Sequence, residues 1–139
     1  KKTIKSCSLS KIETLFRNNT HFKTTIIRFG GLFGYNRKPF NFIAKSKIIE
    51  NPEGYVILIH RDDCIQIIEQ NSWNETFNAC TDSHPTRREF YTNEAKEQGK
   101  KLIFNENSTN TYKIVNSEKL KSLLNYSFKY SNLLNRSYK

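Results

Sequence analysis

Two groups of basic side chains in this sequence have the types and spacing to bind an anion. His84, Arg87 and Arg88 lie at the start of a predicted helix, where backbone amides and guanidinium groups suit a phosphate or carboxylate. Arg37 and Lys38 follow a glycine-rich turn and are placed to hold an anionic substrate. The alternative for the first group is a well-formed helix start alone, and for the second it is charge exposed to solvent. We take Arg37, Lys38, His84 and Arg87 as the candidate substrate-binding residues.

His60, Asp62 and Asp63 have the residue types of a metal or acid–base cluster. The simpler interpretation is that a strand ends at His60 and that the two carboxylates begin a helix. An aspartate there can cap the helix and adds favourable negative charge to its first turn. We favour this structural interpretation and predict no metal site.

These side chains must be positioned by the elements that the apolar pattern predicts. Helices are predicted over residues 6–18, in a short stretch from Pro39, from Asp62, over residues 86–99, and after Asn116 or Ser117. Strands are predicted at residues 23–29, 55–59, 76–79, 101–104 and 112–115, with a short edge strand at Phe128 and Tyr130. Helices and strands alternate along the chain, which indicates an α/β or α+β fold.

Local signals predict where some of these elements begin and end. Residues 86–89 form a capping box, in which the Thr86 hydroxyl bonds the Glu89 amide and the Glu89 carboxylate bonds the Thr86 amide. Gly99 supplies the residue of positive φ that commonly follows a helix end. The tail after Leu134 is predicted to fray.

The segment 23–35 carries the strongest strand signal. A β-branched run leads through Arg28 into the glycine-rich turn 30–34, as when a buried strand ends in a loop that lies close to another group. In an open α/β sheet, ligands bind at this carboxyl edge. We expect Arg28 to pair with a carboxylate such as Glu13 of the preceding helix, and phosphate binding is the alternative.

The composition predicts one soluble, cytoplasmic domain. The 139 residues are 36% hydrophobic and 26% charged, and no apolar run has the length of a membrane span. Three widely spaced cysteines without a Cys-x-x-Cys motif favour reduced thiols over disulfides or a zinc site. The formal charge of +10 fits a nucleic-acid partner, but the basic residues are scattered. A general excess of lysine explains the charge more simply, so nucleic-acid binding is kept as the alternative function.

Three segments, in this order and spacing, resemble one protein family. They are RFGGLFGYNRKPFNFIAKS (28–46), VILIHRDDCIQII (56–68) and FNACTDSHPTRREFYT (77–92). The chain is similar to the carboxyl-terminal half of extended or atypical short-chain dehydrogenase/reductases, the NAD(P)-dependent nucleoside-diphosphate-sugar epimerase-like proteins.

The resemblance implies the carboxyl-terminal part of a Rossmann-type α/β fold. Residues 1–36 would be the last helix, strand and turn of a truncated Rossmann domain. Residues 37–139 would be a small α+β substrate-binding lobe with a frayed tail. The amino-terminal βαβ units, with their glycine-rich dinucleotide turn, are expected to lie upstream of this sequence.

The resemblance also implies where a cofactor and a substrate would lie. The cofactor would be NAD or NADP, with the backbone of Phe29, Gly30 and Gly31 near the nicotinamide. Since the sequence contains no Gly-x-Gly-x-x-Gly motif, we expect no tight dinucleotide binding by this chain alone. The substrate would be a sugar nucleotide or a related small molecule, although the asparagine that follows this strand in the family is replaced by glycine.

The family's catalytic pair, Tyr-x-x-x-Lys, has no counterpart here. One register places Lys5 and Leu9 at the two positions, and the other places Cys7 and Lys11 there. We therefore predict a fragment of an oxidoreductase or epimerase that is inactive as an isolated chain, and a catalytically dead interaction module is a further alternative. The sheet edge left unpaired would invite a homodimer or the missing amino-terminal half.

Overall fold

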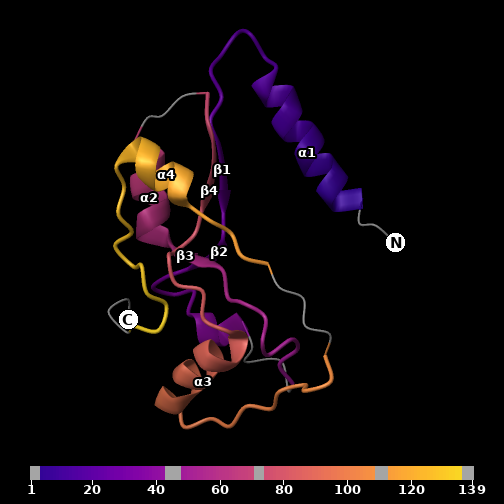
Figure 1. The fold of residues 1–139 in the computed structure, drawn as a ribbon, viewed down its shortest axis with the longest axis vertical. Coiled ribbons are helices and arrows are strands. Elements are labelled where there is room, and N and C mark those ends of the chain that lie inside the picture. Colours follow the sequence, from indigo (N-terminus) through magenta and orange to yellow (C-terminus); the bar gives the residue numbers. More distant parts are fainter. Residues whose placement is uncertain (1–3, 43–47, 71–73, 109–112, 136–139) are drawn as a thin grey trace.

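The computed structural model describes residues 4–42, 48–70, 74–108 and 113–135. In chain order its elements are α1 (Ile4–Arg17), β1 (Ile26–Phe29), β2 (Gly31–Phe33), the 3-10 helix η1 (Pro39–Phe42), β3 (Leu58–His60), α2 (Arg61–Glu69), β4 (Thr76–Ala79), α3 (Arg87–Glu97) and α4 (Glu118–Leu124). Figure 1 shows β1 and β4 beside α2 and α4 in the upper half, with α3 at the lower end. The predicted alternation of helices and strands is confirmed from α1 to α3, but no strand separates α3 from α4 in the described residues.

The strands form two parallel pairs that join segments far apart in the sequence. β1 pairs with β4, with Ile26 opposite Thr76, and β2 pairs with β3, with Gly31 opposite Leu58. The predicted strand at 76–79 is confirmed at those residues, and the one predicted at 23–29 is confirmed as a shorter strand. Parallel pairing of this kind is typical of α/β proteins.

The predicted turn at Gly30 and Gly31 is wrong, because the backbone there runs on from β1 into β2. The Gly30 amide still donates to the carbonyl of Ala79 in β4, at 2.8 Å. The Gly31 amide donates to the carbonyl of Ile57, just before β3, at 2.9 Å. One continuous stretch therefore pairs first with β4 and then with β3, and the reversal comes only at Gly34, where φ is 138°.

Two apolar clusters form the core. The first joins β3, α2, β4, α4 and the segment after α4, through Ile59, Cys64, Ile67, Phe77, Ala79, Leu120, Tyr126 and Phe128. The second joins β2, β3 and α3, through Phe33, Val56, Leu58, Phe90 and Leu133. Both clusters include residues of β3, so this short strand connects the two halves of the molecule.

Three predicted strands are not present in the described residues. Residues 101–104 contribute only an isolated bridge between Ile49 and Phe104, and residues 113–115 form no strand, while Tyr112 lies outside the described part. Ile103 and Ile114 are about three-fifths exposed, so neither segment has a buried face against which a strand could pack. The third segment, at 128–130, packs Phe128 into the core as irregular chain.

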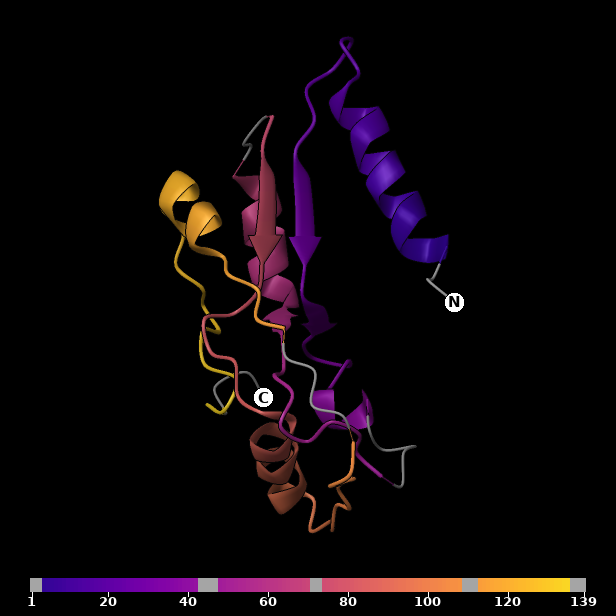
Figure 2. The same cartoon turned by 45° about the vertical axis from the view of Figure 1, so that its right-hand side comes forward.

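The predicted amino-terminal helix is confirmed as α1, and its apolar residues are exposed. Leu9 is 64% exposed and Phe16 48% exposed. Both views show α1 standing apart from the other helices (Figure 2). Polar contacts join it to the strands. The Arg17 guanidinium donates to the Thr76 hydroxyl at 2.9 Å, and the predicted pair of Arg28 with Glu13 is confirmed, with Nε to Oε1 at 2.9 Å.

Among the described residues, no helix combines the length and the apolar character needed to cross a membrane.

Candidate functional site

Phe29 ends β1 and lies at the carboxyl edge of the β1–β4 pair, where ligands bind in α/β proteins. In a parallel strand, successive residues direct their backbone groups to opposite edges. The amides of Ile26 and Gly30 both donate toward β4, to Glu75 and Ala79. The backbone N–H and C=O of Phe29 therefore point to the other edge of β1. This placement suits the predicted role of Phe29 beside a nicotinamide ring, which stays a prediction.

Close packing against the β3 segment leaves little room for a side chain at Gly30 or Gly31. A Cβ on Gly30 would lie 3.1 Å from the Ile57 carbonyl oxygen and 3.3 Å from the Cβ of Cys80. A Cβ on Gly31 would lie 2.7 Å from the Leu58 side chain. The approach of the β3 segment alone explains both glycines, and their proposed contact with a cofactor stays a prediction.

Arg37 and Lys38 lie in the turn that follows β2. The Arg37 amide donates to the Gly34 carbonyl at 2.7 Å, and its Nε donates to the Leu32 carbonyl at 2.8 Å. Arg37 thus closes the turn and remains exposed at its end, and Lys38 is exposed beside it. The positively charged side chains of Arg37 and Lys38 thus lie side by side on a short turn that these hydrogen bonds stabilise.

The start of α3 has the predicted capping box. The Glu89 amide donates to the Thr86 hydroxyl at 3.2 Å, and the Thr86 amide donates to the Glu89 carboxylate at 2.8 Å. The Arg87 amide donates to the Gly54 carbonyl, at 2.8 Å. An anion at this helix start would therefore depend on side chains and not on these backbone amides.

His84 and Arg87 provide such side chains. The Arg87 guanidinium is exposed and makes one long hydrogen bond, of 3.3 Å, to the Glu50 carbonyl. The His84 Nδ1 is buried and has no hydrogen-bond partner in the described structure. The ring borders a cavity of about 160 Å³ that Thr81, Val115 and Glu118 also line. A buried ring nitrogen beside a cavity can bond to a hydroxyl of a bound molecule.

His60, and not Asp62, caps α2. The Asp62 amide donates to His60 Nδ1 at 3.2 Å, so the predicted aspartate cap is wrong while the helix itself is confirmed. The imidazole is fully buried, and its ring centroid lies 5.1 Å from that of Phe33 and 3.8 Å from that of Tyr130. Burial lowers the pKa of His60, although the neighbouring carboxylates oppose this.

Asp62 links the turn after β2 to the carboxyl-terminal segment. Its Oδ2 accepts a hydrogen bond from the Tyr35 hydroxyl at 2.8 Å and one from the Tyr130 hydroxyl at 3.4 Å. Burial disfavours the ionised carboxyl, but the Tyr35 hydroxyl and nearby cationic groups outweigh it and lower the pKa of Asp62. Sequence analysis missed Tyr35, and no local pattern identifies it.

Among the described residues, no set of three potential ligands could hold a metal ion.

The two catalytic registers considered for the family pair both fall on α1. Leu9 and Lys11 are exposed there, and the side chains of Lys5 and Cys7 lie outside the described part. The other thiols are buried in the core. Burial raises the pKa of Cys64 to about 11 and also raises the pKa of Cys80. Neither is therefore an activated nucleophile at neutral pH.

No protein-family model matches the chain, and no curated protein matches it either. Solved structures do match. The dTDP-glucose 4,6-dehydratase from Bacillus anthracis in complex with NAD has a TM-score of 0.72 at 15% identity, over 95% of this chain and 50% of that chain. The UDP-glucose 4-epimerase from Thermotoga maritima with UDP-glucose has a TM-score of 0.68 at 16% identity, over 88% of this chain and 46% of that chain. A functionally unknown conserved protein from Silicibacter pomeroyi has a TM-score of 0.70 at 20% identity, over 88% and 50%.

The chain shares its fold with these epimerases and dehydratases. It spans about half the length of the chains that it matches. The resemblance indicated by the three motif segments is thus confirmed at the level of the fold.

Proposed function

We propose that this chain is the carboxyl-terminal part of an NAD(P)-dependent oxidoreductase or epimerase that acts on a sugar nucleotide or a related small molecule. The observation that carries the proposal is the parallel β1–β4 pair that ends at Phe29. This pair lies within a fold that matches about half the chain length of an enzyme solved with NAD and of another solved with UDP-glucose. In such a sheet the carboxyl edge is where a dinucleotide and its substrate meet.

The residues of this chain are suited to contact the nicotinamide end of the cofactor only. The backbone of Phe29 lies at the edge of β1 that points away from β4, where it can line a nicotinamide ring. A glycine-rich pyrophosphate turn is absent from the sequence, so the rest of the dinucleotide needs residues from elsewhere. When bound, the cofactor would supply hydride transfer, and this chain would contribute one wall of its site.

The substrate contacts would come from the turn after β2 and from the start of α3. Arg37, Lys38 and Arg87 offer positive charge to phosphate oxygens, and arginine can bind them with two parallel hydrogen bonds. His84 offers the unpartnered Nδ1 beside its cavity to a hydroxyl group. These four residues remain the substrate-binding candidates.

The test uses the isolated chain with two probes. Calorimetric titration with NADH is expected to give no measurable binding, because the pyrophosphate turn is missing. In contrast, UDP-glucose is expected to shift amide signals near His84 and Arg87 in nitrogen–proton correlation spectra. The Arg87→Ala variant should lose those shifts, and the Arg61→Ala variant, which removes an exposed arginine outside the proposed site, should keep them.

Two results would contradict the proposal. Micromolar affinity for NADH would mean that this chain holds a complete dinucleotide site of another kind. The proposed substrate-binding role of His84 and Arg87 is wrong if UDP-glucose shifts none of these amide signals. It is also wrong if the shifts persist unchanged in the Arg87→Ala variant.

A further inference from the structure

Tyr35 has a backbone conformation that its residue type disfavours. Its φ is 33°, in the left-handed region, where a side chain crowds the backbone. In the described ranges, the other non-glycine residues with positive φ are asparagines, at positions 51, 74 and 125, and asparagine tolerates this region better than most residues. A bulky residue keeps such a conformation only when surrounding contacts hold it there.

Tyr35 and Asn36 are the two central residues of a tight turn. The Arg37 amide donates to the Gly34 carbonyl at 2.7 Å, and the Gly34 amide donates to the Arg37 carbonyl at 3.2 Å. In two-residue turns of this kind, a central position with positive φ is normally taken by glycine or asparagine. Glycine at position 35 would remove the strain, so the tyrosine side chain must contribute something that glycine cannot.

The Tyr35 side chain links the tip of this turn to α2. Its hydroxyl donates to Oδ2 of Asp62 at 2.8 Å, and hydrogen bonds to an ionised carboxylate are among the stronger ones. The Arg61 guanidinium lies 4.1 Å from the centre of the tyrosine ring. Tyr35 is 52% exposed, so burial in the core does not hold it. These contacts with the start of α2 therefore fix the conformation of the turn.

The turn presents the two adjacent cations Arg37 and Lys38. The Arg37 Nε donates to the Leu32 carbonyl at 2.8 Å, so this side chain is anchored to the backbone that leads into the turn. A phosphate that contacts both cations binds more tightly when they are already in position, because binding then costs less conformational freedom. The conformation of the turn therefore controls how well the two cations bind an anion.

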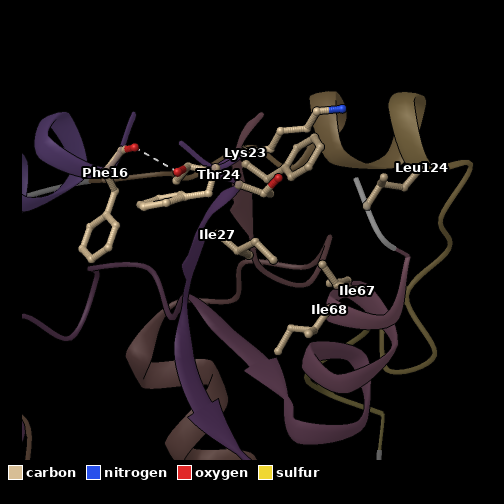
Figure 3. Close-up of a pocket in the computed structure, with 10 residues that line it drawn as sticks. Phe16, Lys23, Thr24, Ile27, Ile67, Ile68 and Leu124 are labelled. Carbon is tan, nitrogen blue, oxygen red and sulfur yellow. Dashed lines mark hydrogen bonds between the residues drawn. The ribbon is translucent and has the colours of Figure 1, made fainter. Parts of the chain in front are cut away.

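The groove beside β1 is poorly suited to a phosphate. It has a volume of about 480 Å³, and Lys23 is the one cation among the described residues that line it. Figure 3 shows the apolar part of its lining, which includes Phe16, Ile27, Ile67, Ile68 and Leu124. Phosphate oxygens need several donors or positive charges around them, and this groove offers few.

The cavity beside His84 is also poorly suited to a phosphate. Asp82 and Glu118 line it, and the Lys121 ammonium pairs with both carboxylates, at 2.8 Å and 2.7 Å. One positive charge between two negative charges leaves the cavity wall net negative, which repels a phosphate but admits a neutral hydroxyl. In contrast, residues 34–38 include two cations and no acidic residue.

We propose that Tyr35 is a positioning residue, which through its bond to Asp62 holds Arg37 and Lys38 where they bind the phosphate groups of the substrate. The proposal rests on the proposed function, since it assigns the phosphate groups of that substrate to the turn after β2. Tyr35 acts through the turn and makes no contact with the substrate itself.

The test titrates this chain with inorganic pyrophosphate and with UDP-glucose in nitrogen–proton correlation spectra. Both probes should shift the amide signals of Arg37 and Lys38. Tyr35→Phe keeps the ring beside Arg61 and removes only the hydroxyl, and it should raise the dissociation constant for pyrophosphate about fivefold. Tyr130→Phe is the matched control. It removes the longer bond, of 3.4 Å, to the same Asp62 oxygen and should leave the affinity unchanged.

Tyr35→Gly separates positioning from a merely structural role. Glycine relieves the strain at φ 33°, so the thermal midpoint should change little. The affinity for pyrophosphate should nevertheless fall as far as in Tyr35→Phe, because the link to Asp62 is lost. Heteronuclear relaxation of the ligand-free variant should show that the Arg37 and Lys38 amides become more mobile. A variant that loses stability but keeps its affinity would contradict the positioning role.

Three further results would overturn the proposal. They are amide signals of Arg37 and Lys38 that neither probe shifts, wild-type affinity in Tyr35→Phe, and an equal loss of affinity in Tyr130→Phe. The two probes also separate this proposal from the proposed function. Pyrophosphate binding that depends on the Tyr35 hydroxyl, without UDP-glucose shifts near His84 and Arg87, contradicts the function alone. UDP-glucose binding that is unchanged in both Tyr35 variants contradicts the positioning role alone.

Discussion

The Tyr126 hydroxyl donates a hydrogen bond of 2.6 Å to Oδ1 of Asp63, and both side chains are buried. The same oxygen accepts from the Lys129 amide at 2.8 Å, and Oδ2 accepts from the Tyr130 amide at 3.3 Å. Burial, together with this bond to Asp63, raises the pKa of Tyr126 well above its ordinary value, so the phenol keeps its proton. One carboxylate at the start of α2 thus fixes residues 126–130, the first part of the segment that follows α4.

We expect Asp63→Ala to lower the free energy of unfolding by about 3 kcal/mol, because it leaves two amides without an acceptor and leaves the Tyr126 hydroxyl only the longer bond, of 3.1 Å, to Gln66. Tyr126→Phe should lower the free energy of unfolding by about 1–2 kcal/mol, since it removes only one of the three hydrogen bonds to Asp63. Urea denaturation measures both. Asp82→Ala is the control, because Asp82 is 44% exposed and its ion pair with Lys121 should contribute less than about 1 kcal/mol. Equal effects for Asp63→Ala and Asp82→Ala would rule out this role of Asp63.

Features that depend on neighbouring residues were predictable from the sequence. The capping box at Thr86, the helix end at Gly99 and the strand at 76–79 all follow from residues a few positions apart, and each is present. Arg28 could be paired with Glu13 because the helix and strand that carry them are consecutive. The parallel pairing followed from the family resemblance and not from any local pattern.

Features that depend on distant partners were not predictable. The sequence around Asp63 indicates only an aspartate in the first turn of a helix, but its hydrogen-bond partners lie 63 to 67 residues away. The strand propensity of residues 101–104 and 113–115 was not realised, because neither segment has a buried face. Gly30 and Gly31 suggested a turn because nothing in the sequence shows that β3 passes close beside them. In the candidate site, the helix start at 86–89 was predicted, but the link from Tyr35 to Asp62 was not.

Gly34 is expected to tolerate no side chain. Its φ of 138° suits glycine alone, and a Cβ there would lie 2.8 Å from Nε2 of the buried His60 ring. We expect Gly34→Ala to lower the free energy of unfolding by about 2–4 kcal/mol in thermal or urea denaturation. Gly99→Ala is the matched control, since Gly99 has a φ of 60° and open space around it, and should cost about 1 kcal/mol. A Gly34→Ala effect no larger than that of Gly99→Ala would show that His60 moves aside freely.

The buried thiols are expected to resist alkylation in the folded protein. Since the pKa of Cys64 is raised to about 11, only about one molecule in a thousand carries that thiolate at pH 8. Cys80 is 1% exposed and its thiol donates to the Val115 carbonyl at 3.2 Å. Iodoacetamide labelling followed by peptide mass spectrometry should modify both only in urea. Ile68→Cys places a thiol at a 59% exposed position of the same helix as Cys64 and should react at once. Native labelling of Cys64 as fast as this control would contradict the prediction.

His60 should make the protein less stable in mild acid. Because burial lowers its pKa in the folded state, the unfolded chain binds a proton below about pH 6.5 while the folded protein does not. Above that pH the imidazole is neutral in both states and contributes no pH dependence. Below it, the free energy of unfolding should fall by at most about 1.4 kcal/mol per pH unit, until the folded pKa is reached. Urea titrations from pH 8 to pH 5.5 measure this slope, which His60→Gln should reduce and His21→Gln, at an exposed histidine, should leave unchanged. A His60 pKa at or above 6.5 in proton NMR of the folded wild-type protein would refute the argument even if His60→Gln failed to fold.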